Sequence, residues 1–272
     1  MPELPEVETV VQELLFNQIV GKKIKNIEVL WPRTVVPTSE HFIPLLQGKT
    51  IQGIKRRGKY LVFSLSDGYF LYVHLRMTGH FTFSPPSHAR VILHLSDGRT
   101  LYYNDPRKFG RFTLVADASH LEEKLGLEPL EPSFTLSAFK TLIKGRQRQI
   151  KPLLLDQSVI AGLGNIYVDE ALWLAKIHPK TLSNSLTDSD LQHLHKAVQE
   201  VLLRGLETKG TTLGKGKSNF YRVDGARGSH QDLLSVFRRT GLPCPRCNTP
   251  LIRLLVAQRS SHICPSCQKE FT

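Results

Sequence analysis

The spacing of apolar residues changes along the chain, from helical to strand-like and back to helical. Over residues 5–16 the apolar side chains fall three or four positions apart, and Pro5 with two nearby glutamates suits the first turn of a helix. Between residues 59 and 104 four runs are rich in β-branched and aromatic residues, as strands are: KYLVFSL, YFLYVHL, RVILHL and TLYYN. Ser-Asp-Gly turns at 66–68 and 96–98 predict two β-hairpins. This pattern predicts an antiparallel β-sandwich or barrel with a flanking helix.

The helical spacing returns beyond residues 126–133, a segment with two prolines that is predicted to be a linker. Helices are expected over residues 137–144, 165–177 and 188–206, where apolar residues again recur at intervals of three and four. Five glycines lie among basic residues between positions 210 and 228, which predicts a mobile loop. The fold class is therefore expected to be α+β.

Basic residues exceed acidic ones, with 36 Lys and Arg against 24 Asp and Glu and a formal net charge of +12. This surplus favours a polyanionic partner, either nucleic acid or an anionic membrane surface, although basicity can also serve solubility alone. No stretch approaches the roughly 20 apolar residues of a membrane-spanning helix. The opening MPELPEVE lacks the basic and apolar regions of a secretory signal. We therefore expect a cytoplasmic protein without a membrane partner, in a compartment where disulfides are rare.

All four cysteines of the chain stand in two pairs near its end. Cys244-Pro-Arg-Cys247 is followed, after sixteen residues, by Cys264-Pro-Ser-Cys267. Two such pairs at this separation can place four thiolates around one zinc ion, whereas disulfides or free thiols are the alternatives. The run LIRLLV and residues 259–263 would form a β-hairpin between the pairs, and several arginines make this module basic. A basic zinc finger indicates nucleic-acid binding but says nothing of catalysis.

A proline stands directly after the initiator methionine. Pro2 is small enough for Met1 to be removed, which would leave a secondary amine at the N-terminus. An α-amino group titrates near pH ~8, against ~10.4 for lysine, so more of it is neutral and nucleophilic at pH 7. Such an amine can attack the anomeric carbon of a sugar and form an iminium, and Glu3 and Glu6 could transfer protons. Taken alone, these residues favour the simpler interpretation that the prolines and glutamates only start a helix.

The opening MPELPEVETV resembles that of the formamidopyrimidine-DNA glycosylases. Further segments resemble the same family in the same order, namely KRRGKYL, HLRMTG, NDPRKFG, IKPLLLDQ, AGLGNIYVDEALW and the finger CPRC…AQRSSHICPSCQ. The resemblance implies a bifunctional glycosylase and abasic-site lyase of base-excision repair. Such an enzyme removes 8-oxoguanine and formamidopyrimidines from double-stranded DNA and cleaves the strand by β,δ-elimination. Two alternatives stay open: an endonuclease VIII-like enzyme for oxidised pyrimidines, and a non-catalytic zinc-ribbon protein that binds damaged DNA.

The resemblance also implies roles for individual residues. The catalytic set would be Pro2 as the nucleophile, Glu3 for proton transfer, Lys59 at the phosphate beside the lesion, and Arg259 in strand cleavage. Met77, Arg107 and Phe109 would fill the gap left by the extruded base. The other expected DNA contacts are made by His74, His88, Lys151 and Asn165. The cofactor would be one structural zinc ion, held by Cys244, Cys247, Cys264 and Cys267, and the enzyme is expected to act as a monomer.

Three domains are implied by the same resemblance: a catalytic β-sandwich over residues 1–130, a helix–two-turn–helix domain with a lesion loop over 131–235, and a zinc-finger hairpin over 236–272. The chain departs from the family pattern at several places, one of them the run KGRQRQ where the family has lysines before IKP. Only His88 is present where two histidines are common, Phe237 replaces a tyrosine, and the loop at 209–230 differs most. Because that loop would close over the flipped base, the last departure concerns lesion preference.

Overall fold

The computed structural model describes residues 1–117, 119–214 and 220–270. The chain forms two compact units, one built from residues 1–122 and 205–231 and the other from residues 123–204 and 232–272. In chain order the elements of the first unit are α1 (Leu4–Phe16), β1 (Ile24–Val29), η1 (Pro32–Thr34), β2 (Val35–Val36), α2 (Ser39–Leu46), β3 (Ile51–Arg57), β4 (Tyr60–Leu65), η2 (Ser66–Gly68), β5 (Phe70–His74), β6 (His80–Thr82), β7 (Ala89–Leu95), β8 (Thr100–Asn104), β9 (Arg111–Val115) and α3 (Ser119–Glu122).

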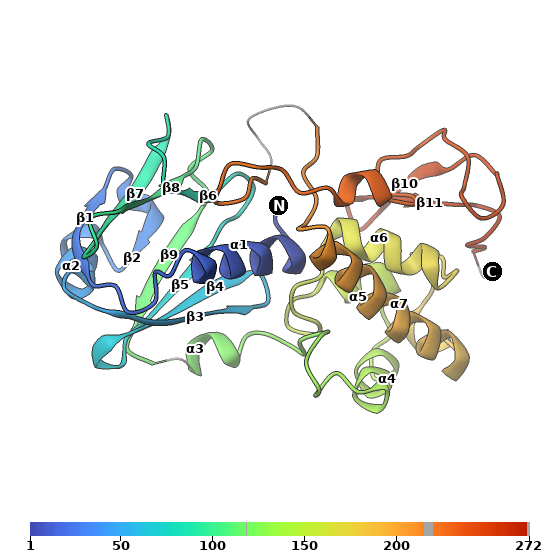
Figure 1. Ribbon diagram of the computed structural model, residues 1–272. Coiled ribbons are helices and arrows are strands. Elements are labelled where there is room, and N and C mark those ends of the chain that lie inside the picture. Colours follow the sequence, from blue (N-terminus) through green and yellow to red (C-terminus); the bar gives the residue numbers. More distant parts are fainter. Residues whose placement is uncertain (118, 215–219, 271–272) are drawn as a thin grey trace. The chain divides into compact units, whose positions relative to one another are not determined.

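Two sheets form the first unit, as the strand-like runs predict. Their strand orders are β1-β7-β8-β6 and β2-β9-β5-β4-β3, and every pair is antiparallel except the two-residue pairing of β2 with β9. Both predicted hairpins are present, since residues 66–68 join β4 to β5 and residues 96–98 join β7 to β8. Helix α1 lies against β3 and β4 (Figure 1). The predicted sandwich with its flanking helix is thus confirmed.

The core of the first unit is apolar and rich in aromatic rings. Helix α1 buries one face, including Val7, Val10 and Leu14, which are all fully buried. Between the sheets Tyr103 and Phe112 pack edge to face, with ring centroids 4.8 Å apart. Burying side chains of this kind contributes about 1.5–3 kcal/mol each, so the core holds the turns at the strand ends in place.

Residues 205–231 belong to the first unit, and two carboxylates of α1 bond to this segment. Glu6 accepts a hydrogen bond from the backbone N–H of Thr211 (2.7 Å). Glu13 pairs with Arg222 and also accepts from the N–H of Val223 (2.7 Å). These units therefore do not follow the boundaries expected at residues 130 and 235. The loop predicted at 210–228 includes residues 215–219, which lie outside the described residues.

The second unit is helical and ends in a hairpin. Its elements are α4 (Leu136–Lys144), α5 (Ile150–Leu155), α6 (Asn165–Leu174), η3 (Ser183–Ser185) and most of α7 (Asp188–Glu207), then η4 (His230–Leu233), which begins in the first unit, and β10 (Ile252–Val256) with β11 (Arg259–Ile263). Helix α6 ends three residues before the predicted position because Lys176 adopts a left-handed conformation, with φ of 60°. No helix within the described ranges is both long and apolar enough to span a membrane.

Two tight turns connect α5 to α6, and one side chain holds both. The amide of Gln157 donates to the carbonyls of Leu155 and Leu163, each at 2.9 Å, and accepts from the N–H of Gly162 at 3.0 Å. Strands β10 and β11 pair antiparallel, with Ile252 opposite Ile263. The helical region and the finger hairpin therefore form as predicted.

Candidate active site and zinc centre

Two buried carboxylates lie at the start of α1. Glu3 precedes the helix and is 3% exposed, and Glu6 is 1% exposed. The backbone N–H of Glu3 donates to one oxygen of Glu6 (2.8 Å), and the N–H of Thr211 donates to the other. Gly210 lies directly on this carboxylate, since a Cβ there would stand 2.9 Å from Cγ of Glu6. Glu6 therefore fixes the start of the helix, where Pro2 is buried as well.

The surroundings of the chain's terminal amine disfavour its charged form. Burial lowers the pKa of the Met1 amine, and the nearby cations Lys59 and Arg107 lower it further, although Glu3 and Glu6 act in the opposite direction. Lys59 lies in the turn between β3 and β4 and is 5% exposed. The fold thus brings an amine that favours neutrality, two carboxylates and two cations together. Glu3 and Lys59, two of the expected catalytic residues, are thus both near the terminal amine.

His74 lies at the end of β5, close to the same group of charges. Burial, with Arg76 and Lys59 nearby, lowers the pKa of His74 to about 3. Its Nδ1 accepts the backbone N–H of Arg76 (3.0 Å), and its ring packs edge-on against Tyr60 (4.7 Å between centroids). A neutral ring with this acceptor carries its hydrogen on Nε2. His74 can therefore donate a hydrogen bond to a phosphate, but it adds no positive charge.

The three residues expected to fill the gap in DNA lie on two turns of the first unit. Met77 is 38% exposed in the turn between β5 and β6, and Phe109 is 48% exposed in the turn between β8 and β9. Arg107 is exposed on the second turn, with its guanidinium 4.8 Å from the centre of the Phe109 ring. Exposed apolar side chains on turns are not part of the core, which favours an interaction role for Met77 and Phe109 over a packing role.

His88 is half-buried beside these turns. Its backbone N–H donates to the side-chain oxygen of Asn104 (3.0 Å), and its Nδ1 lies 2.8 Å from the hydroxyl of Ser87. Arg90, which stands where the family commonly has a second histidine, donates through Nε to the carbonyl of Asp105 (2.9 Å). The departure at position 90 therefore has a structural role of its own.

Lys151 is not exposed to solvent, as a direct contact with DNA would require. It is fully buried in α5, and its Nζ donates to Asp169 (2.6 Å) and to the carbonyl of Ser260 (2.7 Å). The second oxygen of Asp169 accepts from the backbone N–H and from Nδ1 of His262, at 3.0 and 2.9 Å. A direct phosphate contact by Lys151, as expected from the sequence, conflicts with this burial. Its ammonium instead ties two helices to the finger strand β11.

Asn165 takes part in the same attachment. It is the first residue of α6, and its amide donates to the carbonyl of Ser260 (3.0 Å), next to the exposed Arg259. The N–H of Gly162 is taken by Gln157, and α6 begins after Gly164, where the helix dipole favours a phosphate.

The four cysteines gather at the end of the second unit, and all of them are unbridged. Their sulfur atoms lie within 4.8 Å of one another, and Cys247 Sγ stands 3.4 Å from Cys264 Sγ and 3.5 Å from Cys267 Sγ. Zinc–sulfur bonds of about 2.3 Å place the sulfurs of a tetrahedral site about 3.8 Å apart. Trp173 Nε1 and the backbone N–H of Cys267 donate to the sulfurs of Cys244 and Cys264, both at 3.4 Å, which suits thiolates. These four residues form the site for one structural zinc ion.

Loss of one ligand should release the zinc without unfolding the first unit. Cys247→Ser removes the exposed ligand, and because structural zinc supplies much of a finger's folding energy, the hairpin should loosen and DNA affinity should fall. Zinc content by mass spectrometry and DNA affinity by fluorescence anisotropy measure the two effects. Reduced wild-type protein that contains no zinc would show that this metal centre is wrong.

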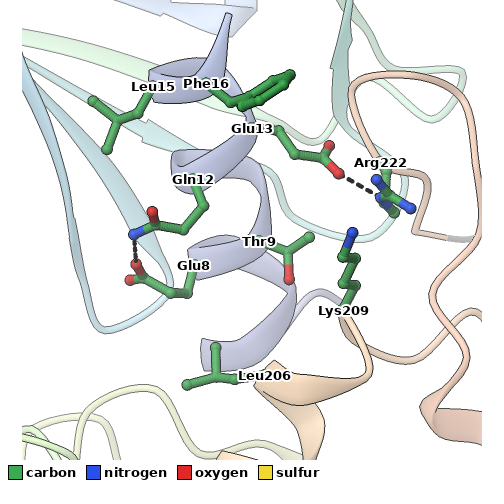
Figure 2. Close-up of a pocket in the computed structure, with 9 residues that line it drawn as sticks. All are labelled: Glu8, Thr9, Gln12, Glu13, Leu15, Phe16, Leu206, Lys209 and Arg222. Carbon is green, nitrogen blue, oxygen red and sulfur yellow. Dashed lines mark hydrogen bonds and ion pairs between the residues drawn. The ribbon is translucent and has the colours of Figure 1, made fainter.

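A cavity of about 800 Å³ lies along α1 in the first unit (Figure 2). Three of its charged groups have partners: Glu13 pairs with Arg222, and Glu8 bonds Gln12 (2.6 Å) and Arg56 (3.1 Å). None of the described residues that line this cavity belongs to the predicted catalytic, DNA-binding or metal sets.

Comparison with known proteins identifies the family across the whole chain. Three family models match: the formamidopyrimidine-DNA glycosylase N-terminal domain over residues 1–112, the formamidopyrimidine-DNA glycosylase H2TH domain over 125–216, and the zinc finger found in FPG and IleRS over 241–269. The chain is 51% identical to the formamidopyrimidine-DNA glycosylase of Protochlamydia amoebophila, over 99% of this chain and 100% of that protein.

Solved structures of relatives have the same fold. A variant of Lactococcus lactis FPG in complex with Fapy-dG-containing DNA is 40% identical with a TM-score of 0.90, over 99% of this chain and 100% of that one. Wild-type L. lactis FPG in complex with oxidised-pyrimidine DNA is 41% identical with a TM-score of 0.89, over the same shares. With its N-terminal carboxylates, β-sandwich, helical region and four-cysteine finger, the chain belongs to the formamidopyrimidine-DNA glycosylase family.

Proposed function

We propose that this protein is a bifunctional DNA glycosylase and abasic-site lyase of base-excision repair. Its substrate is double-stranded DNA with oxidised purines, 8-oxoguanine and formamidopyrimidines, and it cleaves the abasic strand by β,δ-elimination. The observation that carries the proposal is the group around the terminal amine, where Glu3, Glu6, Lys59 and Arg107 surround an amine whose pKa is lowered. A protein that only binds damaged DNA has no use for such a group.

The proposed reaction begins when removal of Met1 leaves Pro2 as the terminal residue. The neutral amine attacks C1′ of the damaged nucleotide, the bond from C1′ to the base breaks, and the base leaves with the electron pair and gains a proton. Glu3 gives a proton to O4′ as the sugar ring opens, which yields an iminium between Pro2 and C1′. Because Glu3 is buried near the amine, we assign to its carboxyl group the proton transfers during both base loss and ring opening.

Strand cleavage follows from the iminium, which makes the C2′ proton acidic. Loss of that proton expels the 3′ phosphate, and a second elimination expels the 5′ phosphate. In this proposal Lys59 stabilises the charge of the phosphate beside the lesion, and Arg259 grips the phosphate from the finger. Zinc supplies no step of the reaction; it holds the hairpin that carries Arg259.

Positive charge and hydrogen-bond donors hold the DNA. We assign phosphate contacts to His88, to the Nε2 hydrogen of the neutral His74 and to the helix start at Asn165, whereas Lys151 acts on the finger from inside. Met77, Arg107 and Phe109 occupy the gap that the extruded base leaves in the duplex, and this offsets part of the cost of unstacking. We place the protein in the cytoplasm, since a reducing compartment keeps the four cysteines as thiolates for zinc. We expect it to act as a monomer.

Duplexes with different lesions test the proposal and its two alternatives. Single-turnover rates should be highest for 8-oxoguanine and formamidopyrimidine duplexes, with products of both eliminations on a denaturing gel. Faster action on an oxidised pyrimidine would instead favour the endonuclease VIII-like reading, to which the complex of the L. lactis relative with oxidised-pyrimidine DNA gives some weight. Tight binding of all duplexes without any product would leave only the damage-binding protein.

A further inference from the structure

One buried carboxylate connects the two turns that carry the gap-filling side chains. Asp105 directly follows β8, is 1% exposed, and accepts at Oδ2 the backbone N–H groups of Phe109 and Gly110, both at 2.8 Å. Its other oxygen accepts the hydroxyl of Thr78 and, at 3.3 Å, the backbone N–H of Arg107. Asp105 thus bonds directly to Arg107 and Phe109, and to the residue next to Met77.

The backbone of Asp105 is held equally firmly. Its N–H donates to the carbonyl of His88 (3.0 Å), and its own carbonyl accepts from Nε of Arg90 (2.9 Å) and from the N–H of Lys108 (3.2 Å). Lys108, between Arg107 and Phe109, has φ of 62°, a conformation that a non-glycine residue adopts only when its surroundings hold it there. The hydrogen bonds of Asp105 therefore hold this turn in one conformation.

The two turns also meet around one phenol. Tyr103 donates its hydroxyl to the carbonyl of Leu75 (3.3 Å), and a Cβ on Gly79 or Gly110 would lie 1.9 or 1.8 Å from that hydroxyl oxygen. Neither turn can shift alone, because each packs without a side chain against the same ring. Met77 and Phe109 therefore keep a fixed relation to each other.

We infer that Asp105 is the positioning residue for base extrusion: it holds Met77, Arg107 and Phe109 as one rigid unit before DNA binds. The inference rests on the gap-filling role given to these side chains in the proposed function. Asp105 touches neither the reacting sugar nor the phosphate in this account. It keeps the two turns ordered before DNA binds, so no conformational entropy is lost in ordering them when the base leaves the stack.

The test compares two substrates that differ in whether a base must be extruded. Asp105→Ala should slow removal of 8-oxoguanine from a paired duplex by about 10- to 100-fold, the range in which small misplacement acts. Cleavage at a pre-formed abasic site in the same sequence should stay within about threefold, because there is no base to extrude. Single-turnover kinetics on both substrates, with thermal melting of each variant, give the measurements.

Two further variants make the result decisive. Thr78→Val keeps the shape of the side chain and removes only its hydroxyl bond to Asp105, so it should show the same selective loss even if Asp105→Ala does not fold. Asp97→Asn is the matched control, since Asp97 is an exposed turn carboxylate that accepts the N–H of Arg99 (3.1 Å) in another hairpin, and it should change neither rate.

Equal losses on both substrates, or no loss in Thr78→Val, would overturn the role of Asp105. Failure of the wild-type protein to remove 8-oxoguanine or to cleave the abasic site would instead overturn the proposed function. The two failures are thereby distinguished within one set of reactions.

Discussion

Replacing Pro2 with leucine should abolish base removal and strand cleavage together. A bulky residue at position 2 prevents removal of Met1, so the terminal amine shifts by one residue and the secondary amine of Pro2 is lost. Loss of a nucleophile lowers the rates of other enzymes by roughly 10⁴- to 10⁶-fold, and an effect of that size is expected here. Single-turnover assays on 8-oxoguanine and abasic duplexes, with the N-terminus determined by mass spectrometry, measure it.

The matched variant is Pro2→Gly, from which Met1 is still removed. Its terminal primary amine can form an imine, so both activities should persist at a reduced rate. The pH dependence follows from the same site. Burial lowers the pKa of the Met1 amine, and since Pro2 is buried beside the same charges we expect the pKa of its amine to be lowered as well after Met1 is removed, so that activity should persist at lower pH than for an exposed secondary amine. Full activity in Pro2→Leu with Met1 retained would contradict the assignment.

Asp169→Ala should cause the largest loss of stability. The change leaves the ammonium of Lys151, which is fully buried, without its carboxylate partner, and it also removes the one oxygen that accepts from both the backbone N–H and Nδ1 of His262. Breaking a buried ion pair costs about 3–5 kcal/mol of unfolding free energy. Since Lys151 and Asp169 hold β11 through Ser260 and His262, the strand should loosen. Arg259, at its start, should then no longer be held in position, and strand cleavage should fall. Thermal melting and cleavage assays test the two consequences.

A double variant and a surface variant serve as controls. Lys151→Met combined with Asp169→Asn removes both charges and should recover part of the stability, because no buried charge is then left alone. Asp188→Ala breaks the exposed pairs with Lys140 and Lys144 in the same unit and should leave the melting temperature nearly unchanged. If Asp169→Ala had the same melting temperature as Asp188→Ala, the buried pair would not hold the finger.

Much of the fold is predictable because it depends on neighbouring residues. The Ser-Asp-Gly turns set the two hairpins, and the cysteine spacing sets the metal site, since in both cases the deciding groups lie a few positions apart. The end of α6 escapes this reasoning. The apolar spacing continues to residue 177, yet the left-handed residue Lys176 stops the helix earlier.

Contacts between distant residues are what the sequence does not reveal. Glu6 bonds a backbone N–H 205 positions away, which brings residues 205–231 into the first unit against the expected boundary. The family resemblance implies a DNA contact for Lys151, but its partner Asp169 lies on another helix and the pair is buried. One signal was available, since Lys151 stands among the buried residues Ile150, Leu153 and Leu154. A lysine in an apolar helix indicates a buried pair.

Asp105 illustrates the same limit within a motif. An aspartate before a proline is typical of a turn, and NDPRKFG predicts that much. That its carboxylate would also reach Thr78, 27 positions earlier, depends on the pairing of β6 with β8. The exposed side chains of the motif were therefore predictable as candidates, whereas the residue that positions them was not.

Borohydride trapping of the covalent intermediate tests the central claim most directly. The wild-type protein is mixed with an 8-oxoguanine duplex and reduced with borohydride, and the attached residue is located by proteolysis and mass spectrometry. Among the described residues, the site offers the terminal amine and the nearby amine of Lys59, whose charge lowers the pKa of the Met1 amine. The account predicts one adduct on the nitrogen of Pro2 in a peptide that lacks Met1. An adduct on the ε-amine of Lys59, or on a chain that retains Met1, would contradict it.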